Sequence, residues 1–168
     1  MFSSRKIRGV VVSGAAVVAA LTLTAGQSAA QSGCFQVSGR YTEHAATGSQ
    51  CQSPVGLCIA GTYRGDISGS FSGTATTITP AADTPTTSVL TFTSDSSITG
   101  GVNGRHGTLT IKNAGVFTTM RDGSIVDLQT IVGGTGELAG AQGFVRASGT
   151  FSATDGGTSE YEGSVCTR

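Results

Sequence analysis

The sequence has 168 residues, equal numbers of basic and acidic side chains, and 26 glycines. Its ten Lys and Arg residues are too few and too scattered to form the basic stripe that neutralises phosphates, so nucleic acid is not an expected partner. The length fits one domain with a real core.

The first thirty residues have the parts of a cleaved export signal. Arg5, Lys6 and Arg8 are positively charged, residues 10–25 form an uncharged apolar run, and residues 28–30 are small, which predicts cleavage before Gln31. A membrane anchor is the alternative, but the run is shorter than the roughly 20 residues of a spanning helix. We therefore expect a signal peptide over 1–30, and over 31–168 a secreted, extracellular domain without stable membrane insertion. Three of the ten basic residues lie in the signal and all ten acidic residues follow it, so the mature chain carries a net negative charge.

Four cysteines follow the signal, and an even number in an exported chain indicates two disulfides with three possible connectivities. No C-x-x-C spacing occurs and neither histidine lies near a Cys cluster, so neither a metal site nor a cofactor is expected. The preferred pairing joins Cys34 to Cys51 and Cys58 to Cys166. The second bridge would connect an early strand to the last one, because those strands are neighbours in a closed barrel.

Alternation of apolar or glycine residues with polar residues at period two recurs along the mature chain and predicts strands. The alternating runs are 35–42, 59–64, 67–76, 89–93, 107–120, 144–153 and 160–165, and residues 125–132, which are apolar on both faces, are a further strand. Between them lie turn sequences that tolerate positive φ, namely Gly65-Asp66, Asn103-Gly104, Asp122-Gly123 and Asp155-Gly156-Gly157. One helical turn is possible at 137–141.

Two further features refine this prediction. Pro80 and Pro85 bracket a loop that no central strand could accommodate. Residues 113–115 indicate a bulge that bends one long strand; a true turn there would raise the count from eight strands to nine.

About eight antiparallel strands can close as a barrel or stack as a sandwich. Glycines on the apolar faces, at positions 69, 73, 149 and 163, permit the strong coiling that closure requires. The chain also has no Trp to fill the centre of a sandwich. We therefore predict an all-β fold, a single antiparallel barrel of about eight strands.

The stretch Ile131–Gly143, with the sequence IVGGTGELAGAQG, is the most distinctive in the chain. With the strand that follows, it resembles the allene oxide cyclase-like barrel superfamily, which includes the plant dirigent proteins. The resemblance extends over about residues 59–166 and implies a calycin-like barrel and a trimer. It also implies a small apolar molecule inside the barrel, whose cyclisation or isomerisation the protein would steer. The family's catalytic residues lie outside the motif, so none is assigned here.

Candidate site residues follow from which face they share with the core. Glu43 continues the inward alternation of its strand, whereas Asp127 has equally apolar faces on both sides and its direction is open. A carboxyl group in a barrel cavity would have a raised pKa and could serve as acid or base. The expected ligand contacts are aromatic: Tyr41, Tyr63, Phe71, Phe92, Phe151 and Tyr161.

Two functions remain open from the sequence. The first is a binding protein for a small apolar molecule which, if catalytic, would be an isomerase or cyclase. The second is a non-catalytic exported or cell-surface module with a packed interior. The two differ in cavity volume and in the polarity of the interior.

Overall fold

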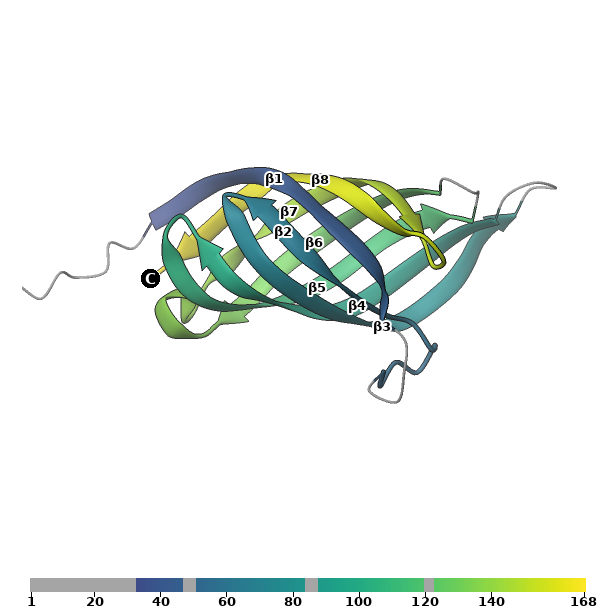
Figure 1. The fold of residues 1–168 in the computed structure, drawn as a ribbon, viewed down its shortest axis with the longest axis horizontal. Coiled ribbons are helices and arrows are strands. Elements are labelled where there is room, and N and C mark those ends of the chain that lie inside the picture. The colour runs from purple at the N-terminus through teal and green to yellow at the C-terminus, as the bar shows by residue number, and fades with distance from the viewer. Residues whose placement is uncertain (1–32, 47–50, 84–87, 120–122) are drawn as a thin grey trace, which may run out of the picture.

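The computed structural model describes residues 33–46, 51–83, 88–119 and 123–168. These residues form eight strands, each antiparallel to the next, and the last strand pairs with the first to close a barrel (Figure 1). The strands are β1 (Gly33–Ala46), β2 (Cys58–Gly65), β3 (Ile67–Asp83), β4 (Ser88–Val102), β5 (Arg105–Thr118), β6 (Ser124–Gly134), β7 (Gln142–Ser152) and β8 (Gly156–Thr167). The predicted antiparallel barrel is confirmed. The predicted signal and its cleavage site lie outside the described residues.

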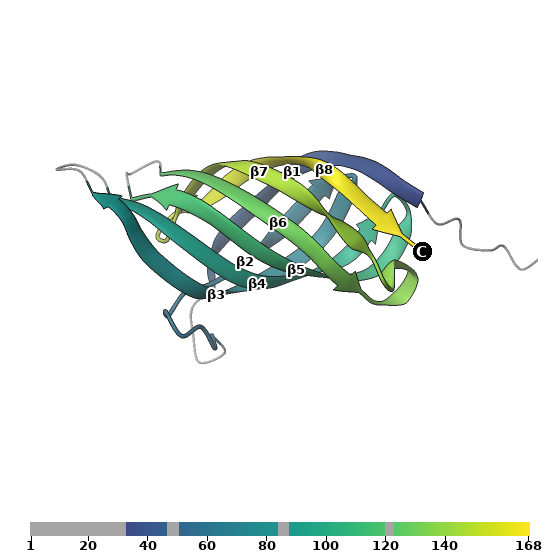
Figure 2. The ribbon, with the colours of Figure 1, turned by 180° about the vertical axis from the view of Figure 1, so that it is seen from behind.

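The strands alternate between inward and outward residues, as the sequence period predicts. In β6, inward residues from Ile125 to Ile131 are buried while the residues between them are exposed. Several exposed residues on β5, β6 and β7 are nevertheless large and apolar: Val116, Val126, Leu128, Val132 and Phe144. Figure 2 shows these three strands side by side on the wall seen from behind.

The prediction that a loop begins at Pro80 is wrong. Pro80 lies within β3, which continues to Asp83 beside β4. A register shift between Pro80 and Ala82 marks an irregularity, and such sites tolerate a residue without an N–H. Pro85 lies outside the described residues.

Strand β5 is continuous, as expected, but the predicted bulge at residues 113–115 is wrong. Pairing is regular there, and the irregularity lies on β6, where Val132 is passed over between Gly133 and Ile131. Gly115 is needed for packing and not for a bulge, because a Cβ at this position would lie 2.6 Å from Cε1 of Phe92. The glycine therefore leaves room for the Phe92 ring inside the barrel.

The preferred disulfide pairing is also wrong. The bridges join Cys34 to Cys166 and Cys51 to Cys58. A bridge does link an early strand to the last one, but that early strand is β1, on which Cys34 lies directly opposite Cys166 of β8. Cys58 instead begins β2 and closes a short loop with Cys51.

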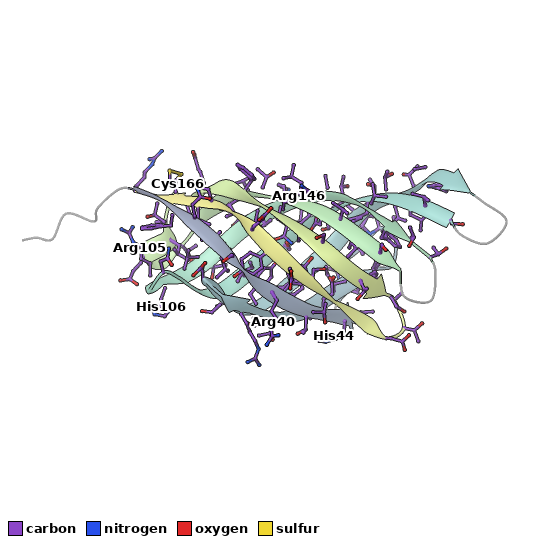
Figure 3. The ribbon with its side chains drawn as sticks, turned by 90° about the horizontal axis from the view of Figure 1, so that it is seen from above. Arg40, His44, Arg105, His106, Arg146 and Cys166 are labelled. Carbon is purple, nitrogen blue, oxygen red and sulfur yellow. A yellow bond between two sulfur atoms is a disulfide. The ribbon has the colours of Figure 1, made fainter. Side chains whose placement is uncertain are left out.

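One half of the barrel interior is packed with side chains. The short 3-10 helix η1 (Gly136–Leu138) lies at this end, and its Leu138 is buried. Further core residues include Ile67, Val102, Leu109, Val145 and Val165. Figure 3 shows His44 at the opposite end of the barrel from Cys166. Among the described residues, no helix has the length and apolar character needed to cross a membrane.

Candidate functional site

The other half of the barrel, where β1 ends, holds a cavity of about 40 Å³. Its polar wall consists of Glu43, Ser94, Asn113 and Asp127. The remaining wall is apolar or aromatic: Tyr41, Leu57, Ile59, Ala75, Phe92, Phe117, Ile125 and Phe151. A water molecule needs roughly 10–15 Å³ of such volume, so the cavity accepts a small head group and not a whole drug-sized molecule.

Five of the eight side chains predicted for the site line this cavity. They are the two carboxyl groups, Glu43 and Asp127, and the aromatic residues Tyr41, Phe92 and Phe151. The structure thus settles the direction of Asp127, which points inward.

The three other predicted contacts, Tyr63, Phe71 and Tyr161, do not line the cavity. Tyr63 stacks on Tyr41 at 4.8 Å between ring centroids, and Phe71 packs edge-on against both rings. The Tyr161 hydroxyl donates to the carbonyl oxygen of Ile67 at 3.0 Å and accepts from its N–H at 2.9 Å. These side chains form the floor beneath the cavity.

A chain of buried hydrogen bonds rises from this floor to Asp127. The Tyr63 hydroxyl donates to Oε1 of Gln129 at 2.8 Å, and Nε2 of Gln129 donates to Oδ2 of Asp127 at 3.0 Å. The Tyr63 hydroxyl thus orients the amide of Gln129, and this amide orients the carboxyl group of Asp127. This arrangement leaves Oδ1 of Asp127 as the oxygen with no hydrogen-bond partner among the described residues.

The two carboxyl groups are buried, with 6% of Glu43 and 5% of Asp127 exposed. Burial, and then the charge of Asp127, raise the pKa of Glu43 to about 7. Burial raises the pKa of Asp127 to about 6, although the hydrogen bond from Gln129 opposes this rise. Both groups therefore change protonation state close to neutral pH.

Sequence reasoning missed the polar residues that β4 and β5 contribute. Nδ2 of Asn113 donates to Oγ of Ser94 and to Oγ of Ser96, at 2.9 Å each, while Oδ1 has no hydrogen-bond partner in the described part of the chain. A signal was available, because Asn113 continues the inward alternation of Leu109 and Ile111. The bulge predicted at residues 113–115 excluded Asn113 from the inward face.

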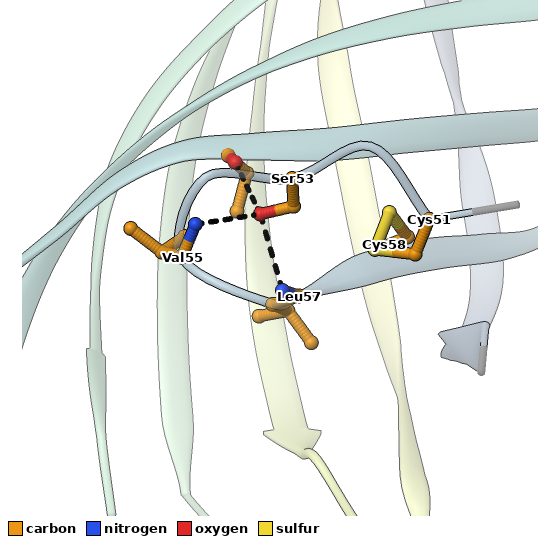
Figure 4. Close-up of a disulfide and its surroundings, with 6 residues drawn as sticks. Cys51, Ser53, Val55, Leu57 and Cys58 are labelled. Atoms are coloured by element: carbon orange, nitrogen blue, oxygen red, sulfur yellow. Dashed lines mark hydrogen bonds between the residues drawn. A yellow bond between two sulfur atoms is a disulfide. The ribbon is translucent and has the colours of Figure 1, made fainter. Parts of the chain in front are cut away.

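A short disulfide-closed loop forms part of the cavity wall (Figure 4). Within it, Oγ of Ser53 donates to the carbonyl oxygen of Ala75 at 2.6 Å. Oγ of Ser53 also accepts hydrogen bonds from the N–H groups of Val55 and Leu57. The loop is thereby fastened to β3, and Leu57 is held against the cavity.

The arrangement is suited to binding and to proton transfer. Among the described residues, no group of three His, Cys, Asp or Glu side chains is placed to hold a metal ion. Two carboxyl groups with different pKa values can act as a general acid and a general base toward a molecule that reaches both.

No family model matches the chain, and no curated protein sequence matches it. Among solved structures, the chain is similar to the pterocarpan synthase dirigent protein GePTS1, with 15% sequence identity and a TM-score of 0.32. The similarity covers 90% of this chain and 97% of that one. At this identity and TM-score, the similarity provides no residue-by-residue correspondence.

Proposed function

We propose that the protein is an exported barrel that binds a small, mostly apolar molecule at its hollow end. The observation that supports this is the cavity itself, in which buried polar groups lie beneath phenyl rings. The polar head of the ligand would enter the cavity. Its apolar body would lie among Phe92, Phe117 and Phe151, whose neighbouring rings are 5.9 Å apart. The two disulfides are compatible with export to an oxidising compartment.

The same site could steer an isomerisation or cyclisation of the bound molecule. Near a pH of about 6.5, a group with a pKa of about 7 is mostly protonated and one with a pKa of about 6 is mostly ionised. Glu43 would then donate a proton to the ligand while Asp127 removes one from another position. The ligand would be isomerised without net gain or loss of protons.

A non-catalytic module is the second candidate, and the packed half of the barrel favours it. A cavity of about 40 Å³ is well below the roughly 300–1,000 Å³ of sites that enclose whole ligands. The two proposals differ in one measurable respect: a pure interaction module would not bind a small molecule at Glu43 and Asp127.

The test is an NMR titration of the exported protein with 2-phenylethanol, which has a small polar head and one phenyl ring. We expect chemical-shift changes at the inward residues of β4, β5 and β6 near the cavity. With nine non-hydrogen atoms, such a probe should bind with a Kd of roughly 10 μM to a few mM.

Two variants make the test specific. Ala75→Leu adds bulk to the cavity wall and should abolish the shifts. Leu128→Ala lies on the outer face of β6, next to Asp127 in the chain, and should leave binding unchanged. The absence of binding at probe concentrations up to about 10 mM would contradict the proposal. Chemical-shift changes that persist in the Ala75→Leu variant would also contradict it.

A further inference from the structure

We propose that the ligand head group is a primary amine, bound as its ammonium ion between Glu43, Asp127 and Asn113. This inference rests on the proposed function of the same cavity and names the class of molecule that it takes. It is carried by three features: the unpartnered oxygen atoms of the cavity, the absence of a basic group among its described lining residues, and the ring of phenyl groups.

The cavity wall presents three buried oxygen atoms without a hydrogen-bond partner among the residues described: Oε1 of Glu43, Oδ1 of Asp127 and Oδ1 of Asn113. The donations from Nδ2 of Asn113 to two serines fix its amide, so the oxygen is the free end. Buried polar atoms normally have partners, and these three are all acceptors when the carboxyl groups are ionised. A primary ammonium group carries three N–H donors and no acceptor, which matches this set.

The charge of the cavity also favours a cation. Of the described residues that line it, two carry carboxyl groups and none is basic. The phenols that face the pair, Tyr41 and Tyr63, are kept neutral because burial raises their pKa values further above the ordinary range. Ionised Glu43 and Asp127 therefore have no counter-charge in the cavity wall, and a bound ammonium ion would supply one.

The phenyl rings fit the same ligand. Phe92, Phe117 and Phe151 line the cavity, and the face of an aromatic ring attracts an organic cation. An ammonium group is close to a water molecule in size, which suits a cavity of about 40 Å³. The apolar remainder of the amine would lie among the rings.

Two rival ligand classes fit less well. A neutral alcohol has one O–H donor and would leave two of the three acceptors unpartnered. A calcium ion takes six to eight oxygen ligands, and a wall of phenyl rings does not supply them. A molecule with its own carboxylate would be repelled by Glu43 and Asp127.

The experiment compares 2-phenylethylamine with 2-phenylethanol, which differ in an ammonium against a hydroxyl head. Both are titrated into the exported protein, with its disulfides formed, at pH values of about 5 and about 8. We expect the amine to bind at least about tenfold more tightly than the alcohol at the higher pH. The preference should shrink at the lower pH, where Glu43 and Asp127 are protonated.

Variants locate the effect. Glu43→Gln and Asp127→Asn should each weaken amine binding by about tenfold while changing alcohol binding by less than about twofold. Glu162→Gln removes an exposed carboxyl group of β8 and should change neither. The pH comparison on the unaltered protein decides the question even where a variant fails to fold.

The outcomes separate the two proposals. Equal binding of amine and alcohol at both pH values would overturn the amine inference and leave the cavity as a binding site for neutral molecules. Binding of neither probe would overturn both proposals. A preference for the amine that survives both cavity variants would place the amine elsewhere on the protein and would also overturn the inference.

Discussion

The stability of the barrel depends on pH because Glu43 titrates. Its pKa rises from 4.5 in the unfolded chain to about 7 in the folded protein, so the folded state binds the proton more tightly. Proton binding at Glu43 therefore adds to the free energy of unfolding. This stabilisation is fully present below a pH of about 4.5 and is lost as the pH rises to about 7. The loss is on the order of 3 kcal/mol, because each pKa unit corresponds to about 1.4 kcal/mol.

Glu43→Gln removes the ionisable group. We therefore expect this variant to unfold at a higher urea concentration than the unaltered protein at a pH of about 8, and at a similar one at a pH of about 4. Urea unfolding followed by circular dichroism measures both. Glu162→Gln serves as the exposed control. A Glu43→Gln variant that is less stable at the higher pH would show that the carboxylate is compensated in the folded state.

Gln129 holds two buried groups in place, and its replacement should affect both. Gln129→Met keeps the length of the side chain but leaves the Tyr63 hydroxyl and Oδ2 of Asp127 without their partner. We expect a loss of about 1–3 kcal/mol in the free energy of unfolding. The pKa of Asp127 should also rise, because the hydrogen bond from Gln129 lowers it. Thr130→Val, at an exposed position of the same strand, is the control, and an unchanged Asp127 titration would contradict the proposed chain.

The direction of Asp127 shows what the sequence could not decide. Both faces of β6 are apolar, so periodicity within this strand is uninformative. The neighbouring strand is not ambiguous, because β7 alternates Val145 and Ala147 with Arg146 and Ser148. Directly opposed residues lie on one face of a sheet, and Asp127 lies opposite Ala147. The register, which the sequence does not state, places Asp127 inside.

At the scale of elements, the strands and several turns were predictable because they depend on local pattern. Asn103 and Gly104 illustrate this, since both have the positive φ, 48° and 79°, that a two-residue hairpin turn needs. The disulfide pairing was not predictable, because it depends on which residues of β1 and β8 face each other. The course of β3 through Pro80 likewise depends on a bulge formed with β4.

The two disulfides should contribute unequally to stability. Cys34 and Cys166 are 132 residues apart, whereas Cys51 and Cys58 are 7 residues apart. Loop-closure entropy in the unfolded chain then gives about 5 kcal/mol for the first bridge and about 2 kcal/mol for the second. We expect the double variant Cys34→Ser/Cys166→Ser to unfold at a distinctly lower temperature than Cys51→Ser/Cys58→Ser.

The shorter bridge should matter more for binding. It closes the loop that holds Leu57 against the cavity, so Cys51→Ser/Cys58→Ser should weaken the binding of 2-phenylethanol. The longer bridge lies at the opposite end of the barrel and should leave this binding unchanged. The reverse order in either measurement, calorimetry or NMR titration, would contradict these roles.

At the scale of the whole molecule, the barrel is divided into a packed half and a hollow half. Tyr63 and Tyr161 lie at the boundary, 5.4 Å apart between ring centroids. Below them the interior is apolar and filled. Above them Glu43 and Asp127 share a small cavity with phenyl rings. The packed half fixes the barrel, and the hollow half is where we locate function.

The most direct test of this division is a carboxyl carbon-13 NMR titration of the protein with both disulfides formed. If Glu43 and Asp127 share a buried cavity, their signals should titrate with pKa values of about 7 and about 6, assigned with the Glu43→Gln and Asp127→Asn variants. Two signals titrating near a pH of about 4, as in exposed carboxyl groups, would show that the hollow end is open to water and would contradict the account.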